Sequence, residues 1–300
     1  MSELFADTRT ENFDVEAVNI HARIGGEGPP LLLLHGFPQT HLMWHSIAPE
    51  LMERFTCVMP DLRGYGGSSC PPNTADNSAY SKREMAKDMV AVMAKLGFKR
   101  FAVVGHDRGG RVSYRMALDG PDVVKCLAVL DIVPTHAMWS GMDAKLAMKA
   151  YHWLFLAQPH PLPEMLLEKA ARDYVDYTLA AWTASKDLSA FHPEALAGYR
   201  EMAAQKDHIH ALCNDYRAGA TYDFEADGAD LAAGRRISSP TLALWGQSGF
   251  PSQTTGPLAA WEKWCERVEG YGISAGHFIV EENPRDTLAA LLPFLDRHGR

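Results

Sequence analysis

The stretch FAVVGHDRGGRVSYRMA, residues 101–117, runs from an apolar segment through a glycine-flanked turn into a helical pattern. Asp107 stands at the middle of the turn, with Gly105 two residues before it and Gly109 two residues after it. This G-x-D-x-G spacing allows a tight strand-to-helix turn whose central side chain points out over the sheet edge. Because a helix N-terminus stabilises an anion, we expect Asp107 to be ionised and to act as a nucleophile. The alternative is an ordinary helix-capping aspartate.

A nucleophile of this kind needs a histidine late in the chain and an acid that orients it. His277 follows the last expected strand, within the sequence GHF. The loop after the strand at 241–246 reads WGQSGFPSQ and contains no carboxylate. We therefore assign the acid to Asp131, which follows the preceding core strand, and predict Asp107, Asp131 and His277 as a catalytic group. Capping or surface roles are the alternative for Asp131 and His277.

Backbone donors can be supplied by the segment HGFP, residues 35–38. We expect the N–H groups of Phe37 and Arg108 to point at one oxygen and to stabilise the negative charge that develops there. A simple β-turn at Pro38 is compatible with this role.

Arg108 and Arg111 lie one turn apart on one face of the expected helix. A guanidinium close to a helix N-terminus opposes the helix dipole, so this placement is explained if an anion lies between the two side chains. Arginine binds a carboxylate through two parallel hydrogen bonds. We therefore expect Arg108 and Arg111 to bind a substrate carboxylate. The alternative is a pair of surface arginines, one of them bridged to an acid.

Short apolar segments that read as buried strands alternate with helical patterns along much of the chain. The expected strands lie at the start of 55–69 and at 31–36, 101–105, 125–132, 241–246 and 268–273. The expected helices lie at 81–97, from 109 onwards, at 257–267 and in the final segment up to 297. This alternation predicts an α/β fold with a mostly parallel sheet flanked by helices. Residues that follow the strands should meet at one edge of the sheet: His35, Asp61, Asp107, Asp131, Gly246 and His277.

The alternation stops between 136 and 220, where the chain has aromatic helical segments and the proline-rich joint QPHPLPE but no clear strand. We expect a helical cap domain at 136–220, inserted between the two parts of a core domain at 1–135 and 221–300.

The formal net charge of −8 makes nucleic acids and anionic membrane surfaces poor partners, and a small anion would need a local positive site. Five cysteines without metal-binding spacing predict reduced thiols, a cytoplasmic location, and neither metal nor cofactor. The polar, acidic N-terminus is unlike a signal peptide, and the apolar runs are too short to span a membrane.

The assembled residues resemble the α/β-hydrolase family, in the branch with aspartate nucleophiles that contains haloalkane dehalogenases, epoxide hydrolases and fluoroacetate dehalogenases. The resemblance covers the whole chain and is carried by HGFPQTHLMW, DLRGYGGSS, GHDRGGR, LDIVPT, YHWLFLAQP, DYRAG and GHF. The combination of GHDRGGR with YHW and DYRAG is similar to the fluoroacetate dehalogenases. Arg108 stands where haloalkane dehalogenases and most epoxide hydrolases have tryptophan.

This resemblance implies an α/β-hydrolase fold and the conversion of fluoroacetate to glycolate and fluoride through an ester on Asp107. It maps halide-binding donors onto His152, Trp153 and Tyr216, and it makes Trp182 a candidate for the pocket lining. Without the resemblance the three donors read as core residues. It also implies a homodimer formed through the cap.

Two alternatives stay open at this stage. An epoxide hydrolase would use the same aspartates and histidine, with cap tyrosines polarising the epoxide oxygen. Arg108 argues against it, because a neutral epoxide offers two arginines nothing to bind. A non-catalytic binding protein of the same fold is the other alternative, although such proteins usually lose a catalytic residue, and all three are present here.

Overall fold

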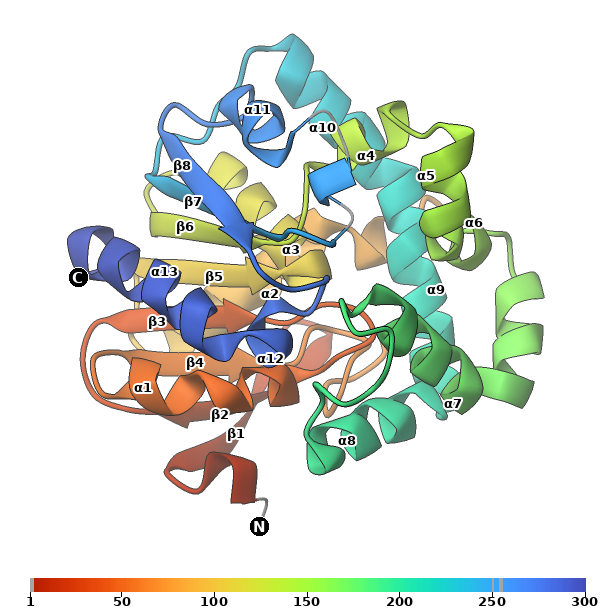
Figure 1. Ribbon diagram of the computed structural model, residues 1–300, viewed down its shortest axis with the longest axis horizontal. Helices are drawn as coiled ribbons and strands as arrows, with labels where there is room; N and C mark the ends of the chain where they lie inside the picture. The colour runs from red at the N-terminus through yellow and green to blue at the C-terminus, as the bar shows by residue number, and fades with distance from the viewer. Residues whose placement is uncertain (1–2, 250, 254–255) are drawn as a thin grey trace.

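The structure is a computed structural model that describes residues 3–249, 251–253 and 256–300. In this part of the chain, a sheet of eight strands runs in the order β1-β2-β4-β3-β5-β6-β7-β8 (Figure 1). The strands are β1 Thr8–Val15, β2 Val18–Gly25, β3 Pro30–Leu34, β4 Thr56–Pro60, β5 Phe101–His106, β6 Val124–Leu130, β7 Thr241–Gly246 and β8 Val268–Ile273. Only the pairings of β2 with β1 and β4 are antiparallel. The predicted α/β class with a mostly parallel sheet is confirmed.

Helices cover both faces of this sheet, which explains why strands such as β5 are buried along their whole length. Figure 1 shows α1, α12 and α13 in front of the sheet and α2 and α3 behind it. The core helices are α1 Ala48–Met52, α2 Lys82–Lys95, α3 Asp107–Asp119, α11 Pro257–Glu262, α12 Ile279–Glu282 and α13 Pro284–His298. Short 3-10 helices are η1 Glu3–Phe5, η2 His41–Ser46, η3 Ser78–Tyr80 and η4 Pro251–Gln253. None of the described helices is long and apolar enough to cross a membrane.

The described segment between β6 and β7 contains seven helices joined by loops and no named strand, and the sequence predicts such a strand-free region at 136–220. Its helices are α4 Thr135–Ser140, α5 Ala144–Lys149, α6 Tyr151–Leu156, α7 Leu162–Trp182, α8 Pro193–Ala203, α9 Lys206–Ala220 and α10 Tyr222–Ala232. Figure 1 shows most of them gathered on one side of the sheet. The division into a core at 1–135 and 221–300 and a cap at 136–220 stays a prediction.

Both ends of α2 carry the residues that commonly cap helices, whereas α11 differs from the expected range. The Ser81 side chain accepts a hydrogen bond from the Glu84 N–H and caps the N-terminus of α2. Gly97 follows the end of α2 with φ +86°, a backbone conformation that favours glycine. The helix expected at 257–267 is shorter, because α11 ends at Glu262.

Candidate active site

Asp107 occupies a strained turn between β5 and α3. Its φ of +46° lies in the left-handed region, which a non-glycine residue adopts at a cost of order 1–3 kcal/mol. The flanking glycines permit the turn, because a Cβ on Gly109 would lie 2.3 Å from the carbonyl oxygens of Leu34 and His35. A Cβ on Gly105 would lie 2.3 Å from the Ser113 hydroxyl. The predicted close approach of strand and helix is therefore present, and it holds the Asp107 carboxylate at the carboxyl edge of the sheet.

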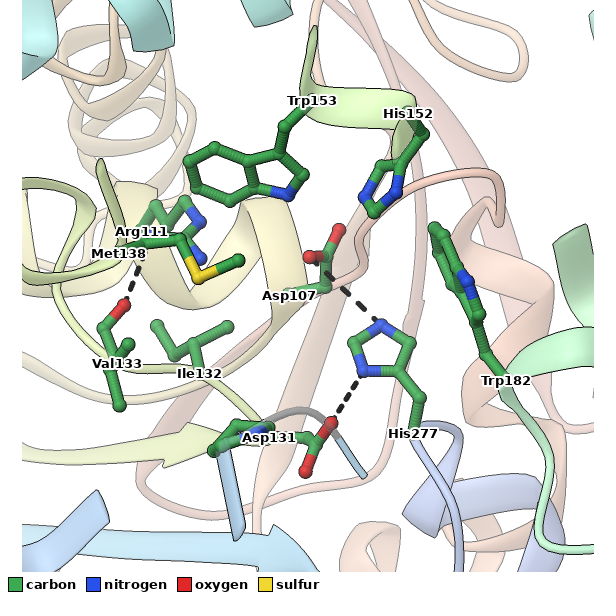
Figure 2. A pocket seen from close by; sticks show the side chains of 11 residues that line it. Asp107, Arg111, Asp131, Ile132, Val133, Met138, His152, Trp153, Trp182 and His277 are labelled. Atoms are coloured by element: carbon green, nitrogen blue, oxygen red, sulfur yellow. Dashed lines mark hydrogen bonds and ion pairs between the residues drawn. The ribbon is translucent and has the colours of Figure 1, made fainter. Parts of the chain in front are cut away.

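His277 lies between two carboxylates that come from neighbouring strands (Figure 2). Its Nδ1 is 2.6 Å from Asp131 Oδ2, and its Nε2 is 4.0 Å from Asp107 Oδ2. The other oxygen of Asp131 accepts a hydrogen bond of 2.8 Å from the Gly246 N–H at the end of β7. The acid that pairs with the histidine therefore follows β6, where the sequence interpretation places it, and it is anchored to β7.

The electrostatics of this group favour the ionised form of the Asp107 carboxyl. Burial by itself raises the pKa of Asp107, but the nearby charges of His277 and Arg108 outweigh this effect and lower the pKa below its ordinary value. Burial lowers the pKa of His277, but the hydrogen bond and charge of Asp131 outweigh it and raise the pKa. His277 Nε2 has no hydrogen-bond partner among the described residues, so this nitrogen is available to a molecule beside Asp107.

The segment HGFP brings one of the two predicted backbone donors to the carboxylate. The Phe37 N–H donates to Asp107 Oδ1 over 2.9 Å. The Arg108 N–H makes no hydrogen bond to this carboxylate among the described residues. Gly36 permits the approach of the two segments, because a Cβ there would lie 2.4 Å from the Asp107 Cβ.

The sequence predicts that the Arg108 guanidinium is free to bind a substrate carboxylate, but in the structure it pairs with an acid of the protein. It is fully buried in an ion pair with Asp215 of α9: Nε is 3.0 Å from Oδ2 and Nη2 is 2.6 Å from Oδ1. Its guanidinium also lies 4.2 Å from the Tyr216 ring centroid. Nη1 is buried without a hydrogen-bond partner in the described part of the chain. The sequence analysis gave no role to Asp215, although it directly precedes Tyr216 in the DYRAG segment.

Arg111 is also buried but is held by weaker partners. Its Nη1 donates to the Val133 carbonyl over 3.0 Å and to the Thr135 hydroxyl over 3.1 Å. Its guanidinium lies 4.5 Å from the Trp153 ring centroid, and its Nε has no hydrogen-bond partner among the described residues. Arg111 therefore carries a positive charge that no carboxylate neutralises at hydrogen-bonding distance within the described residues.

Asp107, Asp131, His277 and Arg111 all face one small cavity, here called the inner cavity. It is lined by Asp107, Arg111, Asp131, Ile132, Val133, Met138, His152, Trp153, Trp182, Pro251 and His277. Its volume is about 30 Å³, whereas one water molecule needs roughly 10–15 Å³ by the same measure. The cavity therefore suits a molecule of few heavy atoms. Figure 2 shows Trp153, His152 and Trp182 around the Asp107 carboxylate, which places Trp182 in the lining as expected.

The predicted halide donors lie close to one another. The His152 ring is 5.6 Å from the Tyr216 ring, and the Trp153 ring is 6.1 Å from it, measured between centroids. Burial keeps the pKa of His152 well below its ordinary value, so this imidazole is neutral and offers one N–H. The Tyr216 hydroxyl is buried without a partner among the described residues. His152 and Trp153 line the inner cavity, but Tyr216 and Arg108 do not belong to its lining.

Sequence reasoning missed several residues of the lining. Ile132 and Val133 follow the predicted acid in the LDIVPT segment, so their position after a core strand was an available signal. Met138 comes from α4, and nothing in its local sequence indicates a pocket. Pro251 lies in the WGQSGFPSQ loop, which the sequence analysis used only for its lack of a carboxylate.

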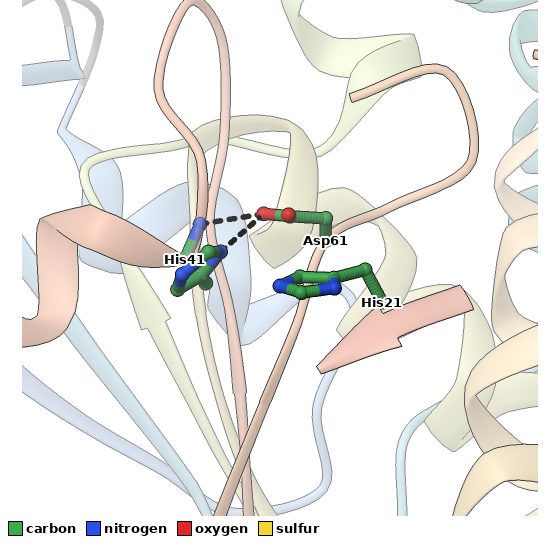
Figure 3. A group of neighbouring side chains, drawn as sticks. All are labelled: His21, His41 and Asp61. Atoms are coloured by element: carbon green, nitrogen blue, oxygen red, sulfur yellow. Dashed lines mark hydrogen bonds and ion pairs between the residues drawn. The ribbon is translucent and has the colours of Figure 1, made fainter. Parts of the chain in front are cut away.

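Two further clusters in the described part of the chain have the donor atoms to hold a metal ion, although none was predicted. His21, His41 and Asp61 form the first (Figure 3). Asp61 Oδ1 already accepts hydrogen bonds from the His41 N–H over 2.8 Å and from its Nδ1 over 2.9 Å. His160, Glu164 and His210 form the second, in which Arg217 also binds the carboxylate. In both clusters the carboxylate is already paired.

Comparisons with known proteins agree on the fold and divide on the chemistry. A family model described as alpha/beta hydrolase fold matches residues 29–284. A fluoroacetate dehalogenase from Burkholderia sp is 44% identical over 282 residues, covering 94% of this chain and 92% of that protein. A soluble epoxide hydrolase from Corynebacterium sp. (strain C12) is 31% identical over 283 residues, covering 93% and 94%. The crystal structure of a protein from Nostoc sp PCC 7120 superposes with a TM-score of 0.94 at 47% identity, covering 97% of this chain and 99% of that one.

Proposed function

The chain belongs to the α/β-hydrolase family, and we propose that it removes halide from haloacetates by hydrolysis, converting fluoroacetate to glycolate and fluoride. The observation that carries this proposal is a buried arginine, Arg111, beside an ionised Asp107 in a cavity of about 30 Å³. A neutral substrate would leave that buried charge without a partner, which is costly in a low-dielectric site. A small carboxylate would neutralise it.

In the first step, the carboxylate of the substrate binds Arg111 Nε and Arg108 Nη1, the guanidinium nitrogens that lack hydrogen-bond partners in the described chain. This orientation presents the α-carbon to Asp107 Oδ2. A carbon–oxygen bond forms, the carbon–halogen bond breaks, and the halide leaves with the bonding electron pair. Asp107 is already an anion, so this step needs no general base.

The departing halide needs donors in a water-poor environment, because fluoride is a poor leaving group and is strongly hydrated in water. His152, Trp153 and Tyr216 are the proposed donors. Their support is that the three rings lie close to one another and that His152 is neutral, which avoids a further buried cation beside Arg108 and Arg111. They would bind the halide while the ester forms.

In the second step, His277 removes a proton from water, and the resulting hydroxide adds to the ester carbon of Asp107. The 4.0 Å between Nε2 and Asp107 Oδ2 is too long for a direct hydrogen bond but leaves the histidine within reach of a bridging water. Oδ1 becomes the oxyanion, and the Phe37 N–H already donates to it. Collapse releases glycolate, which takes a proton from His277, while the water oxygen stays on Asp107.

Halide release from fluoroacetate and chloroacetate, measured beside diol formation from styrene oxide, tests the proposal. We expect fluoride and chloride release with no diol formed. In heavy-oxygen water, a single turnover should place the label in Asp107, because the glycolate oxygen comes from the old carboxylate. Label that appears directly in glycolate would show that water attacks the substrate and would contradict the ester.

An epoxide hydrolase is the second candidate, because a relative with this activity is 31% identical over most of the chain. The unpartnered hydroxyl of Tyr216 also favours it, since a tyrosine can polarise an epoxide oxygen. Arg111 and the small inner cavity oppose it. Styrene oxide turnover without fluoride release would establish this candidate instead.

We also propose that the protein is cytoplasmic and forms a homodimer through the inserted helices. Most of the exposed large apolar side chains in the described chain lie on these helices: Met148, Leu154, Leu162, Met165, Leu166 and Tyr177. Exposed apolar side chains are typical of a protein interface where they join into one surface. Analytical ultracentrifugation of the intact chain tests the association.

A further inference from the structure

A second and larger pocket, here called the outer pocket, opens beside the inner cavity. It has a volume of about 300 Å³ and lies between α5, the end of α7 and the loop after β7. Trp182 and His277 line both the outer pocket and the inner cavity. The inner cavity and the outer pocket therefore share these two side chains as part of their walls.

The charged side chains of the outer pocket have one sign. Lys149, the last residue of α5, and Lys186, which follows α7, both line it and are both exposed. None of its described lining residues is acidic. The whole chain carries a net charge of −8, so an anion approaching at random is repelled on average. The ammonium groups of Lys149 and Lys186 instead attract an anion at the mouth of the outer pocket.

We propose that the outer pocket is an entrance subsite for the carboxylate of the substrate, with Lys149 and Lys186 as its specificity-determining residues. This inference rests on the proposed function, since it requires an anionic substrate. The lysines hold the carboxylate at the mouth, and the substrate then passes between Trp182 and His277 to reach Arg111. No bond is made or broken in the outer pocket.

The outer pocket has lysines and the inner cavity has an arginine, and this difference agrees with a weak entrance site followed by a tighter binding site. A lysine ammonium is a hydrated point charge on a flexible stem, so at an exposed position it binds an anion weakly and releases it fast. Arg111 is buried and offers directed N–H groups, which bind a carboxylate more tightly. The affinity for the anion therefore rises from the mouth to the nucleophile, which favours inward transfer.

The test is steady-state turnover of chloroacetate by the double variant Lys149→Gln/Lys186→Gln. At about 0.01 M salt, where the screening length is roughly 30 Å, we expect KM to rise about three- to tenfold. The kcat should stay within about twofold, because neither side chain touches the reacting atoms. Raising a non-halide salt to about 0.5 M should reduce the difference between variant and wild type. Lys149→Arg/Lys186→Arg keeps both charges and should restore the wild-type KM.

The matched control is Lys145→Gln/Lys169→Gln, which removes two exposed lysines of α5 and α7 that do not line the outer pocket. This control loses the same net charge, so an effect equal to that of the test variant would show a general charge effect and overturn the subsite. An unchanged KM in the test variant would overturn it as well. If the wild-type protein releases no halide from any haloacetate, the proposed function fails, and the subsite falls with it. Normal wild-type turnover with an unaffected test variant rejects the subsite alone.

Discussion

Asp215 binds Arg108 through two of its three guanidinium nitrogens, with Nε 3.0 Å from Oδ2 and Nη2 2.6 Å from Oδ1. The Asp215 carbonyl accepts a further hydrogen bond of 2.8 Å from Nη2. The same carboxylate also pairs with the buried Lys82 ammonium and accepts from the Tyr65 hydroxyl over 2.7 Å. A pair of this kind fixes the guanidinium in one orientation and leaves Nη1 without a hydrogen-bond partner among the described residues.

Asp215→Asn should therefore impair substrate binding as well as folding. Removing one charge from a buried pair costs about 3–5 kcal/mol, because Arg108 then lies buried without a counter-charge. Among the described residues, Lys82 keeps only the Asp223 carboxylate, at 3.5 Å. We expect urea unfolding to register this loss, and we expect the KM for chloroacetate to rise in the protein that remains folded.

The matched control for that variant is Asp227→Asn. Asp227 is a buried carboxylate that pairs with Arg115, also on α3, with Oδ1 2.5 Å from Nη2. It lines neither the inner cavity nor the outer pocket. Arg115 keeps Asp230 as a counter-charge at 2.5 Å, so we expect a loss of stability that is smaller, with an unchanged KM. Equal KM values in the two variants would mean that Asp215 acts only on stability.

Much of the candidate site could be predicted because it depends on local sequence. The spacing of Gly105 and Gly109 identifies the turn at Asp107, and the ends of parallel strands must share one edge of the sheet. That rule is enough to place Asp131 near His277, although 146 residues separate them in the chain.

The rest could not be predicted, because it depends on contacts between distant segments. Asp215 lies 107 residues after Arg108, and no periodicity indicates that they pair. The hairpin of β1 and β2 was missed because β1, with the sequence TRTENFDV, is mostly polar and partly exposed. An edge strand of this kind lacks the continuous apolar run that marks the buried parallel strands.

Arg111→Ala should reduce turnover of haloacetates strongly. A hydrogen bond to a charged group contributes about 1.5–3 kcal/mol, which corresponds to about a ten- to hundredfold loss in kcat/KM. The loss in unfolding free energy should be smaller, about 1 kcal/mol, because the hydrogen bonds of Arg111 go to a carbonyl and a hydroxyl rather than to a carboxylate. Kinetics with chloroacetate and urea unfolding check the two values. Wild-type kcat/KM in this variant would show that the carboxylate binds elsewhere.

His277→Asn should separate the two chemical steps. Displacement of halide needs no base, whereas hydrolysis of the ester does, so the variant should release one halide per site and then stop. Intact-mass measurement after exposure to fluoroacetate should show a glycolate-sized adduct, and peptide mapping should locate it on Asp107. A variant that continues to turn over without an adduct would contradict a role for His277 in ester hydrolysis.

The pH dependence of kcat follows from the need for a base in ester hydrolysis but not in halide displacement. His277 must be neutral to remove a proton from water, and the Asp131 hydrogen bond and charge, which outweigh burial, raise its pKa above the ordinary value of 6.5. As the pH falls through this raised pKa, the imidazole becomes protonated and kcat should decrease, while the first halide-releasing step continues. Rapid-quench experiments below this pKa should therefore show a halide burst followed by a slow phase.

Asp131→Asn removes the charge that raises the pKa of His277, so the acidic limb of its pH profile should move to lower pH, whatever the loss in maximal rate. An acidic limb that stays in place in Asp131→Asn would show that a group other than His277 controls ester hydrolysis.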